Sequence, residues 1–139
     1  MSEITADEYQ KRLTALCIGG SRGFPRKARD RHVMLMAAAH PFDRGMIYTE
    51  KEVDRAIRSW LDRGCPSLAI DEVTIRRELI DANYLMRDDA GRFYAVGAGP
   101  ASISYSEDVA NVDPIRTVER ALEERDRRKR AGPDAGRRG

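Results

Sequence analysis

The residues from Thr49 to Leu61 constrain the fold of this chain more than any other stretch, because they specify both the start and the buried face of one helix. The run TEKE at 49–52 is a capping box: the threonine hydroxyl accepts a hydrogen bond from the backbone N–H of Glu52, whose side chain bonds back. Apolar residues then recur at the spacing of one helix face: Val53, Ala56, Ile57, Trp60 and Leu61. The sequence therefore predicts an amphipathic helix in which Trp60 is mostly buried.

Four further segments carry helix signals. Residues 28–39 contain the apolar run VMLMAAA, which continues right round a helix and so indicates burial on most sides. Residues 72–82 follow an aspartate N-cap and place apolar side chains on one face. Residues 5–17 open on a threonine N-cap, and Pro114 predicts the first position of a last helix with a thin apolar seam. The chain is thus expected to be mainly α-helical.

A short strand and a β-hairpin complete the pattern. The strand is expected near residues 46–48, and residues 85–96 hold two alternating runs around Gly91, which can take the positive φ of a tight bulged turn. Helix, strand, helix, helix, hairpin is the order of a winged helix, whose third helix usually enters the major groove of DNA. The expected fold class is mainly α with a small β-hairpin, winged helix-turn-helix-like, flanked by an N-terminal and a C-terminal helix.

Four segments resemble, in order, the motifs of the DUF2087 family: FPRKARDRHVMLM, YTEKEVDRAI, DEVTIRRELIDANYLMRD and GRFYAV. The resemblance covers residues 24–96. It implies a small winged-helix-like domain of bacteria, found alone or behind the helix-turn-helix domain of transcriptional regulators, and it implies no established activity. The chain departs from the family in a long loop, residues 62–70, and in a C-terminal extension.

The resemblance and the turn signals divide the chain into three parts. Residues 1–23 are expected to form an N-terminal helix and a glycine-containing linker, and residues 24–96 the winged-helix-like domain. Residues 97–139 are expected to hold a loop, the C-terminal helix and a disordered tail that begins at Arg130.

Composition and motifs argue against several classes of function. The 139 residues carry 25 Lys and Arg against 23 Asp and Glu, so phosphate binding would need a local basic patch. The sequence has no GxSxG, HExxH or P-loop pattern and no metal-ligand spacing, so we expect a non-enzymatic protein with no metal or cofactor. The apolar runs are too short to span a membrane and the N-terminus is too polar for a signal peptide, which predicts a cytoplasmic protein with Cys17 and Cys65 reduced.

Basic residues at the start of the 28–39 helix are the main candidates for nucleic-acid contact. The run FPRKARDR supplies four of them: Arg26, Lys27, Arg29 and Arg31. Two interpretations stay open, solvated side chains at a helix start or a phosphate-contacting patch aided by free backbone N–H groups. Arg77 on the third helix and Arg92 on the hairpin would extend the patch. The exposed face of the third helix carries one cation and two acids, which disfavours strongly sequence-specific reading.

Arg76 has a different expected role, because it lies beside the apolar face of the third helix. A buried guanidinium needs a carboxylate partner. Glu50 falls between Ile57 and Leu61 on the wheel of the second helix. The sequence therefore predicts a structural ion pair between Arg76 and Glu50.

Two functions from different classes remain. The first is a winged-helix-type protein that binds DNA with low specificity, such as a bacterial transcription regulator. The alternative is a protein–protein interaction module on the same scaffold that does not touch nucleic acid. A protein partner, or a second copy of the chain, could bind through the C-terminal helix. Its charged run at residues 119–130 is most simply a solvated helix but could also serve a partner or non-specific nucleic-acid binding.

Overall fold

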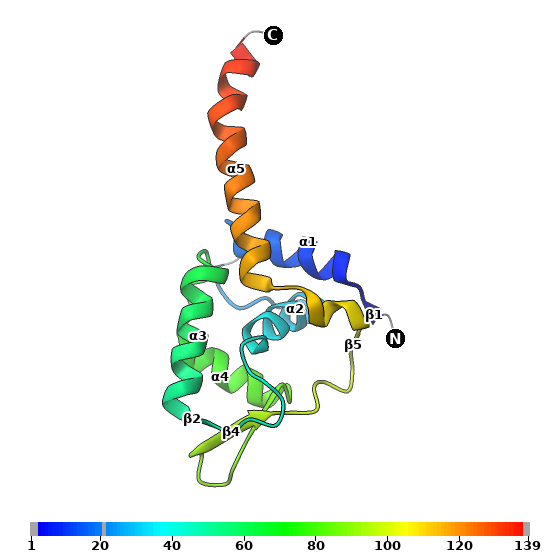
Figure 1. The fold of residues 1–139 in the computed structure, drawn as a ribbon, viewed down its shortest axis with the longest axis vertical. Coiled ribbons are helices and arrows are strands. Elements are labelled where there is room, and N and C mark those ends of the chain that lie inside the picture. Colours follow the sequence, from blue (N-terminus) through cyan, green and yellow to red (C-terminus); the bar gives the residue numbers. More distant parts are fainter. Residues whose placement is uncertain (1–2, 21, 138–139) are drawn as a thin grey trace.

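The computed structural model describes residues 3–20 and 22–137, with side chains as far as residue 131 (Figure 1). The helices are α1 (Ala6–Cys17), α2 (Ala28–Ala39), α3 (Glu50–Gly64), α4 (Glu72–Asp81), the 3-10 helix η1 (Glu107–Asn111) and α5 (Pro114–Arg137). The strands are β1 (Glu3–Ile4), β2 (Tyr48–Thr49), β3 (Leu85–Arg87), β4 (Phe93–Val96) and β5 (Ser104–Tyr105).

A winged helix forms the centre of the molecule, as predicted. The elements α2, β2, α3 and α4 precede the β3–β4 hairpin, and the three antiparallel strands lie in the order β2-β4-β3. Both bonds of the capping box are present: Glu52 N–H donates to Thr49 Oγ1 at 3.2 Å, and Thr49 N–H donates to Glu52 Oε1 at 2.9 Å. Trp60 is fully buried in the core that α3 covers, which confirms its predicted placement.

Local signals also set the start of α4 and the hairpin turn. The Asp71 side chain accepts a bond from Thr74 N–H at 2.8 Å, as an N-cap residue should. Gly91 has a φ of 68° in the turn, the left-handed conformation that glycine adopts at no steric cost. The register of the hairpin pairs Leu85 with Val96 and Arg87 with Tyr94.

The expected loop after residue 96 contains regular structure. Strand β5 pairs in parallel with β1, so that Ile4 lies opposite Tyr105, and η1 follows directly. Helix α5 continues to Arg137 and so includes residues 130–137 of the expected tail; residues 138–139 lie outside the described part. The first turns of α5 pack on the body, and extending an existing helix costs far less than starting one.

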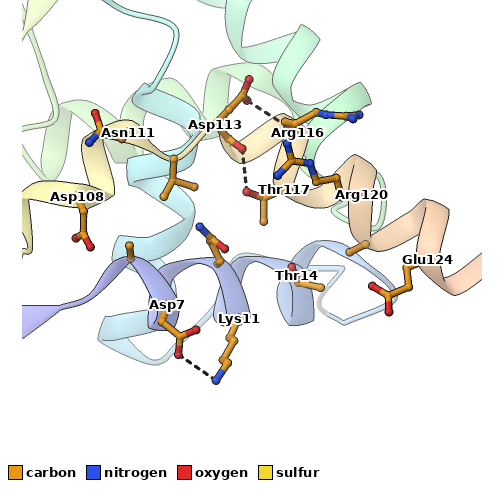
Figure 2. Close-up of a pocket in the computed structure, with 14 residues that line it drawn as sticks. Asp7, Lys11, Thr14, Asp108, Asn111, Asp113, Arg116, Thr117, Arg120 and Glu124 are labelled. Atoms are coloured by element: carbon orange, nitrogen blue, oxygen red, sulfur yellow. Dashed lines mark hydrogen bonds and ion pairs between the residues drawn. The ribbon is translucent and has the colours of Figure 1, made fainter.

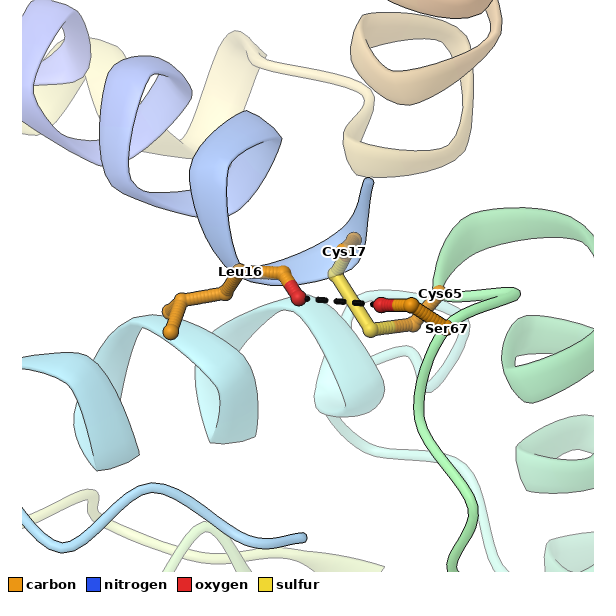
Figure 3. Close-up of a disulfide and its surroundings, with 4 residues drawn as sticks. All are labelled: Leu16, Cys17, Cys65 and Ser67. Carbon is orange, nitrogen blue, oxygen red and sulfur yellow. Dashed lines mark hydrogen bonds between the residues drawn. A yellow bond between two sulfur atoms is a disulfide. The ribbon is translucent and has the colours of Figure 1, made fainter. Parts of the chain in front are cut away.

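A disulfide joins the N-terminal helix to the winged helix (Figure 3). Cys17 ends α1 and Cys65 follows α3, with Cα atoms 4.3 Å apart and both side chains buried. Beside it, the Ser67 hydroxyl donates to the Leu16 carbonyl at 3.1 Å. The expectation of two reduced thiols is therefore wrong, because the packing of α1 against the end of α3 brings together residues separated by 48 positions in the sequence.

The flanking segments share the core of the winged helix. Side chains buried in one cluster come from β1, α1, η1 and α5 as well as from the central helices; those outside residues 24–96 include Ile4, Tyr9, Leu13, Val109 and Val118. Among the described helices, none combines the length and the apolar composition that crossing a membrane requires.

Candidate nucleic-acid interface

The four cations at the start of α2 divide into two free and two paired side chains. Arg26 and Lys27 are exposed and form no ion pair with any residue that the structure describes. Arg29 binds both carboxylate oxygens of Glu8 on α1, at 2.8 and 2.6 Å. Bonds from Arg29, and then from Arg12, lower the pKa of Glu8 to about 2. Arg29 therefore ties α1 to α2, which leaves it poorly placed to contact a phosphate.

Arg31 joins α2 to α4. Its Nη2 donates to Glu78 Oε2 at 2.8 Å, and its guanidinium lies 5.2 Å from the centre of the Phe24 ring, within cation–π range. The pair neutralises one of the two acids that sequence analysis counted on the exposed face of α4. Arg77 and Asp81 of that face are exposed, and neither forms an ion pair with a described residue. With Glu78 paired, Arg77 and Asp81 leave this face of α4 nearly neutral. Arg26 and Lys27 add two free cations at the N-terminal end of α2, the helix that Arg31 joins to α4.

A cleft of about 370 Å³ separates α4 from the hairpin. It is lined by Arg76, Arg77, Ile80, Asp81, Arg87 and Tyr94. Three guanidinium groups therefore line the junction where a winged helix presents its third helix and its wing together.

Arg76 is held by two carboxylates from α3. Its Nη1 is hydrogen-bonded to Asp54, and its Nη2 lies 3.7 Å from Glu50 Oε1. Only 13% of the Arg76 side chain is exposed, and the Tyr94 hydroxyl donates to Glu50 at 3.2 Å. Sequence reasoning selected Glu50 and missed Asp54, although Asp54 lies one helical turn further along the same side of α3.

The wing tip offers little positive charge. Arg92 is exposed, but the neighbouring Asp88 accepts bonds from the backbone N–H groups of Phe93 at 3.1 Å and Arg92 at 2.7 Å. These bonds lower the pKa of Asp88, so its carboxylate stays ionised beside Arg92. With Asp89 exposed next to it, the two acids outnumber Arg92 and the tip carries a net negative charge.

An exposed apolar surface covers the solvent side of the sheet. Tyr94 is buried, so Phe93 and Ala95 point to the opposite side, where Met86 lies across from Ala95. Continuing the β2–β4 register by one residue places Ile47 on the other side of Ala95. Exposed fractions are 69% for Ile47, 54% for Met86 and 49% for Phe93. We call these four residues the outer sheet face, which sequence analysis did not identify.

A polar groove of about 780 Å³ runs between α1, η1 and α5 (Figure 2). Lys11 lies 3.0 Å from Asp7 on one wall, and the Asp113 side chain on the other accepts bonds from the first N–H groups of α5. The charged residues that line it are Asp7, Lys11, Asp108, Asp113, Arg116, Arg120 and Glu124. Its lining combines four acids with three bases, so charge alone does not point to an anionic or a cationic ligand.

A partly buried network links His32 to two tyrosines. The Tyr84 hydroxyl lies 2.9 Å from His32 Nδ1 and is hydrogen-bonded to the Tyr105 hydroxyl, which donates to the His32 carbonyl at 2.8 Å. Burial raises the pKa of Tyr84, and it raises the pKa of Tyr105 to about 12, so both phenols stay protonated. The network fastens β5 to α2. Within residues 3–20 and 22–137, no group of three His, Cys, Asp or Glu side chains could hold a metal ion.

Comparison with known proteins identifies one family. The family model described as "Uncharacterized protein conserved in bacteria (DUF2087)" matches residues 22–96, more than half of the chain and the part that forms the winged helix. No curated protein and no solved structure matches the chain.

Proposed function

The chain belongs to the DUF2087 family, and we propose that it binds double-stranded DNA with low sequence specificity through α4 and the start of α2. The observation that carries this proposal is the pairing of Arg31 with Glu78. The pair neutralises Glu78 on α4, the helix that would approach the major groove of DNA. Arg26, Lys27 and Arg77 form no ion pair with a described residue, so they are free to contact phosphates.

The expected binding is weak and depends on salt. Three phosphate contacts at this surface contribute about −2.7 to the slope of log affinity against log salt, which is a small contribution beside the slope of a dedicated DNA-binding protein. The nearly neutral α4 face offers few donors to base edges, so affinity should vary little with sequence. A bacterial regulator of this kind would need a further contact or a partner to select its target.

The test compares the intact protein with the Arg26→Gln/Lys27→Gln/Arg77→Gln variant by fluorescence anisotropy on a random 20-base-pair duplex between 25 and 200 mM KCl. The slope should flatten by about 2 to 3. A control of equal charge change replaces the exposed cations Arg44, Lys51 and Arg55 by glutamine. Equal losses in both variants, or no binding by the intact protein, would refute the proposal.

A second function, interaction with another protein, is favoured by the outer sheet face. Contiguous apolar side chains on an exposed surface are a common feature of protein interaction sites. If the partner is a second copy, sedimentation equilibrium should show self-association at high concentration, and Ile47→Ser/Met86→Ser should abolish it. A mass equal to that of one chain at every concentration would refute self-association through the outer sheet face.

A further inference from the structure

The distal part of α5 leaves the body of the protein. Its first turns are anchored by Val118, which is fully buried, and by the partly buried Ile115 and Leu122. Beyond Leu122 every side chain is exposed as far as residue 131, and the helix projects from the end of the molecule opposite the hairpin (Figure 1). This part of α5 therefore adds nothing to the core.

The charges along α5 are separated. Glu123 and Glu124 precede the most basic stretch and pair with Arg116 at 3.6 Å and Arg128 at 2.7 Å, while Asp126, within that stretch, lies 4.0 Å from Arg125. Five of the six residues from 125 to 130 are then basic, a segment that we call the basic arm. Of these, Arg127, Lys129 and Arg130 form no ion pair with any side chain that the structure describes.

The chemistry of the basic arm limits what it can bind. It contains no apolar side chain, so it cannot pack as a coiled coil or fill an apolar groove. At 100° per residue, Lys129 and Arg130 lie about 200° and 300° from Arg127 around the helix axis. A flat acidic surface would meet only one side of such a helix, whereas a partner with anionic groups on two sides would meet all three cations.

The major groove of B-form DNA has this arrangement. A helix with its side chains is about 10–12 Å across, and the groove is about 12 Å wide with a row of phosphates on each wall. The corresponding groove of double-stranded RNA is too narrow for side chains to enter. We propose that the basic arm is a second DNA-binding element, which enters the major groove and contacts phosphates on both sides. It is separate from α4 and does not require α4 to touch DNA.

The test uses the intact chain and the Arg127→Gln/Lys129→Gln/Arg130→Gln variant, measured by anisotropy on a 20-base-pair DNA duplex across the same salt range. Losing three contacts should flatten the slope by about 2.7 and lower affinity at 50 mM salt at least tenfold. The melting temperature should not change, because these side chains lie outside the packed body. The Arg44, Lys51 and Arg55 variant again serves as the control of equal charge.

The outcomes separate this inference from the proposed function. A loss in the arm variant with the Arg26/Lys27/Arg77 variant unaffected supports the arm alone, and the reverse result overturns it. An arm variant that loses no more than the control also overturns it. Duplex RNA of the same sequence should bind at least severalfold more weakly than DNA. Equal affinity for RNA would show simple charge attraction in place of major-groove binding, and would refute the inference.

Discussion

Replacing Glu78 by glutamine should change DNA affinity and protein stability in opposite directions. The substitution replaces the carboxylate that holds Arg31 at 2.8 Å by a neutral amide, so α4 loses a negative charge and Arg31, held only by a weaker neutral acceptor, can reach a phosphate. One additional phosphate contact steepens the salt dependence by about 0.9, which corresponds to about eightfold higher affinity at 0.1 M salt. Stability should fall by about 0.2 to 1 kcal/mol, because both side chains of the pair are partly exposed.

The assay pairs two measurements on the same protein: anisotropy with duplex DNA at several salt concentrations, and urea unfolding followed by the fluorescence of Trp60. Asp7→Asn is the matched control. It makes the same change in net charge and frees Lys11 on α1, from an exposed pair at 3.0 Å that lies away from α4. Tighter binding by Glu78→Gln alone would support the interface. An unchanged affinity, or an equal gain in both variants, would refute the reasoning that Arg31 lies beside the DNA.

Three further predictions concern stability. Trp60→Ala should cost about 3 to 5 kcal/mol, because the indole is fully buried, and an unchanged melting temperature would contradict this. Asp54→Ala should lower the free energy of unfolding in urea by about 2 kcal/mol, because the Arg76 guanidinium, only 13% exposed, keeps a single carboxylate, Glu50, 3.7 Å away. Arg76→Met should cost less, because water can hydrate the carboxylates of Asp54 and Glu50. The opposite ranking would show that loss of the Arg76–Asp54 pair is not the cause. The pKa of Glu8 is lower in the folded chain than its ordinary value of 4.5, so the contribution of its carboxylate to the free energy of unfolding is complete above pH 4.5 and is lost as the pH falls towards about 2. Glu8→Gln should therefore reduce the change of the unfolding free energy with pH over that window. Identical pH profiles for the two proteins would show that the bonds from Arg29 and Arg12 to Glu8 contribute nothing.

Local signals predicted the winged helix because each was complete within a few residues. The capping box at Thr49 and Glu52 contains both of its hydrogen-bond partners, and Asp71 caps the helix that starts beside it. By contrast, β1 and β5 are two residues each and about 100 residues apart, so neither carries a detectable pattern. The disulfide between Cys17 and Cys65 depends in the same way on tertiary packing.

The sequence indicated which residues belong to the candidate site, but not which of them form ion pairs. The sequence identified the cations at the start of α2, yet whether each is free depends on helices distant in sequence: Glu8 from α1 holds Arg29, and Glu78 from α4 holds Arg31. The outer sheet face was missed for another reason. Phe93 and Ala95 alternate with Tyr94, but which side of a three-stranded sheet is covered depends on the helices packed against it.

The parallel pairing of β1 with β5 has a consequence for the order in which the chain folds during synthesis. Ile4 is made about 100 residues before its partner Tyr105, an interval of about 5 to 20 s at ordinary rates of translation. All residues of the winged helix have by then been synthesised, but α5, which completes the shared core, has not. Strand β1, and the face of α1 that α5 covers, have no partners during this interval, and their exposed apolar side chains can aggregate or be captured by a chaperone.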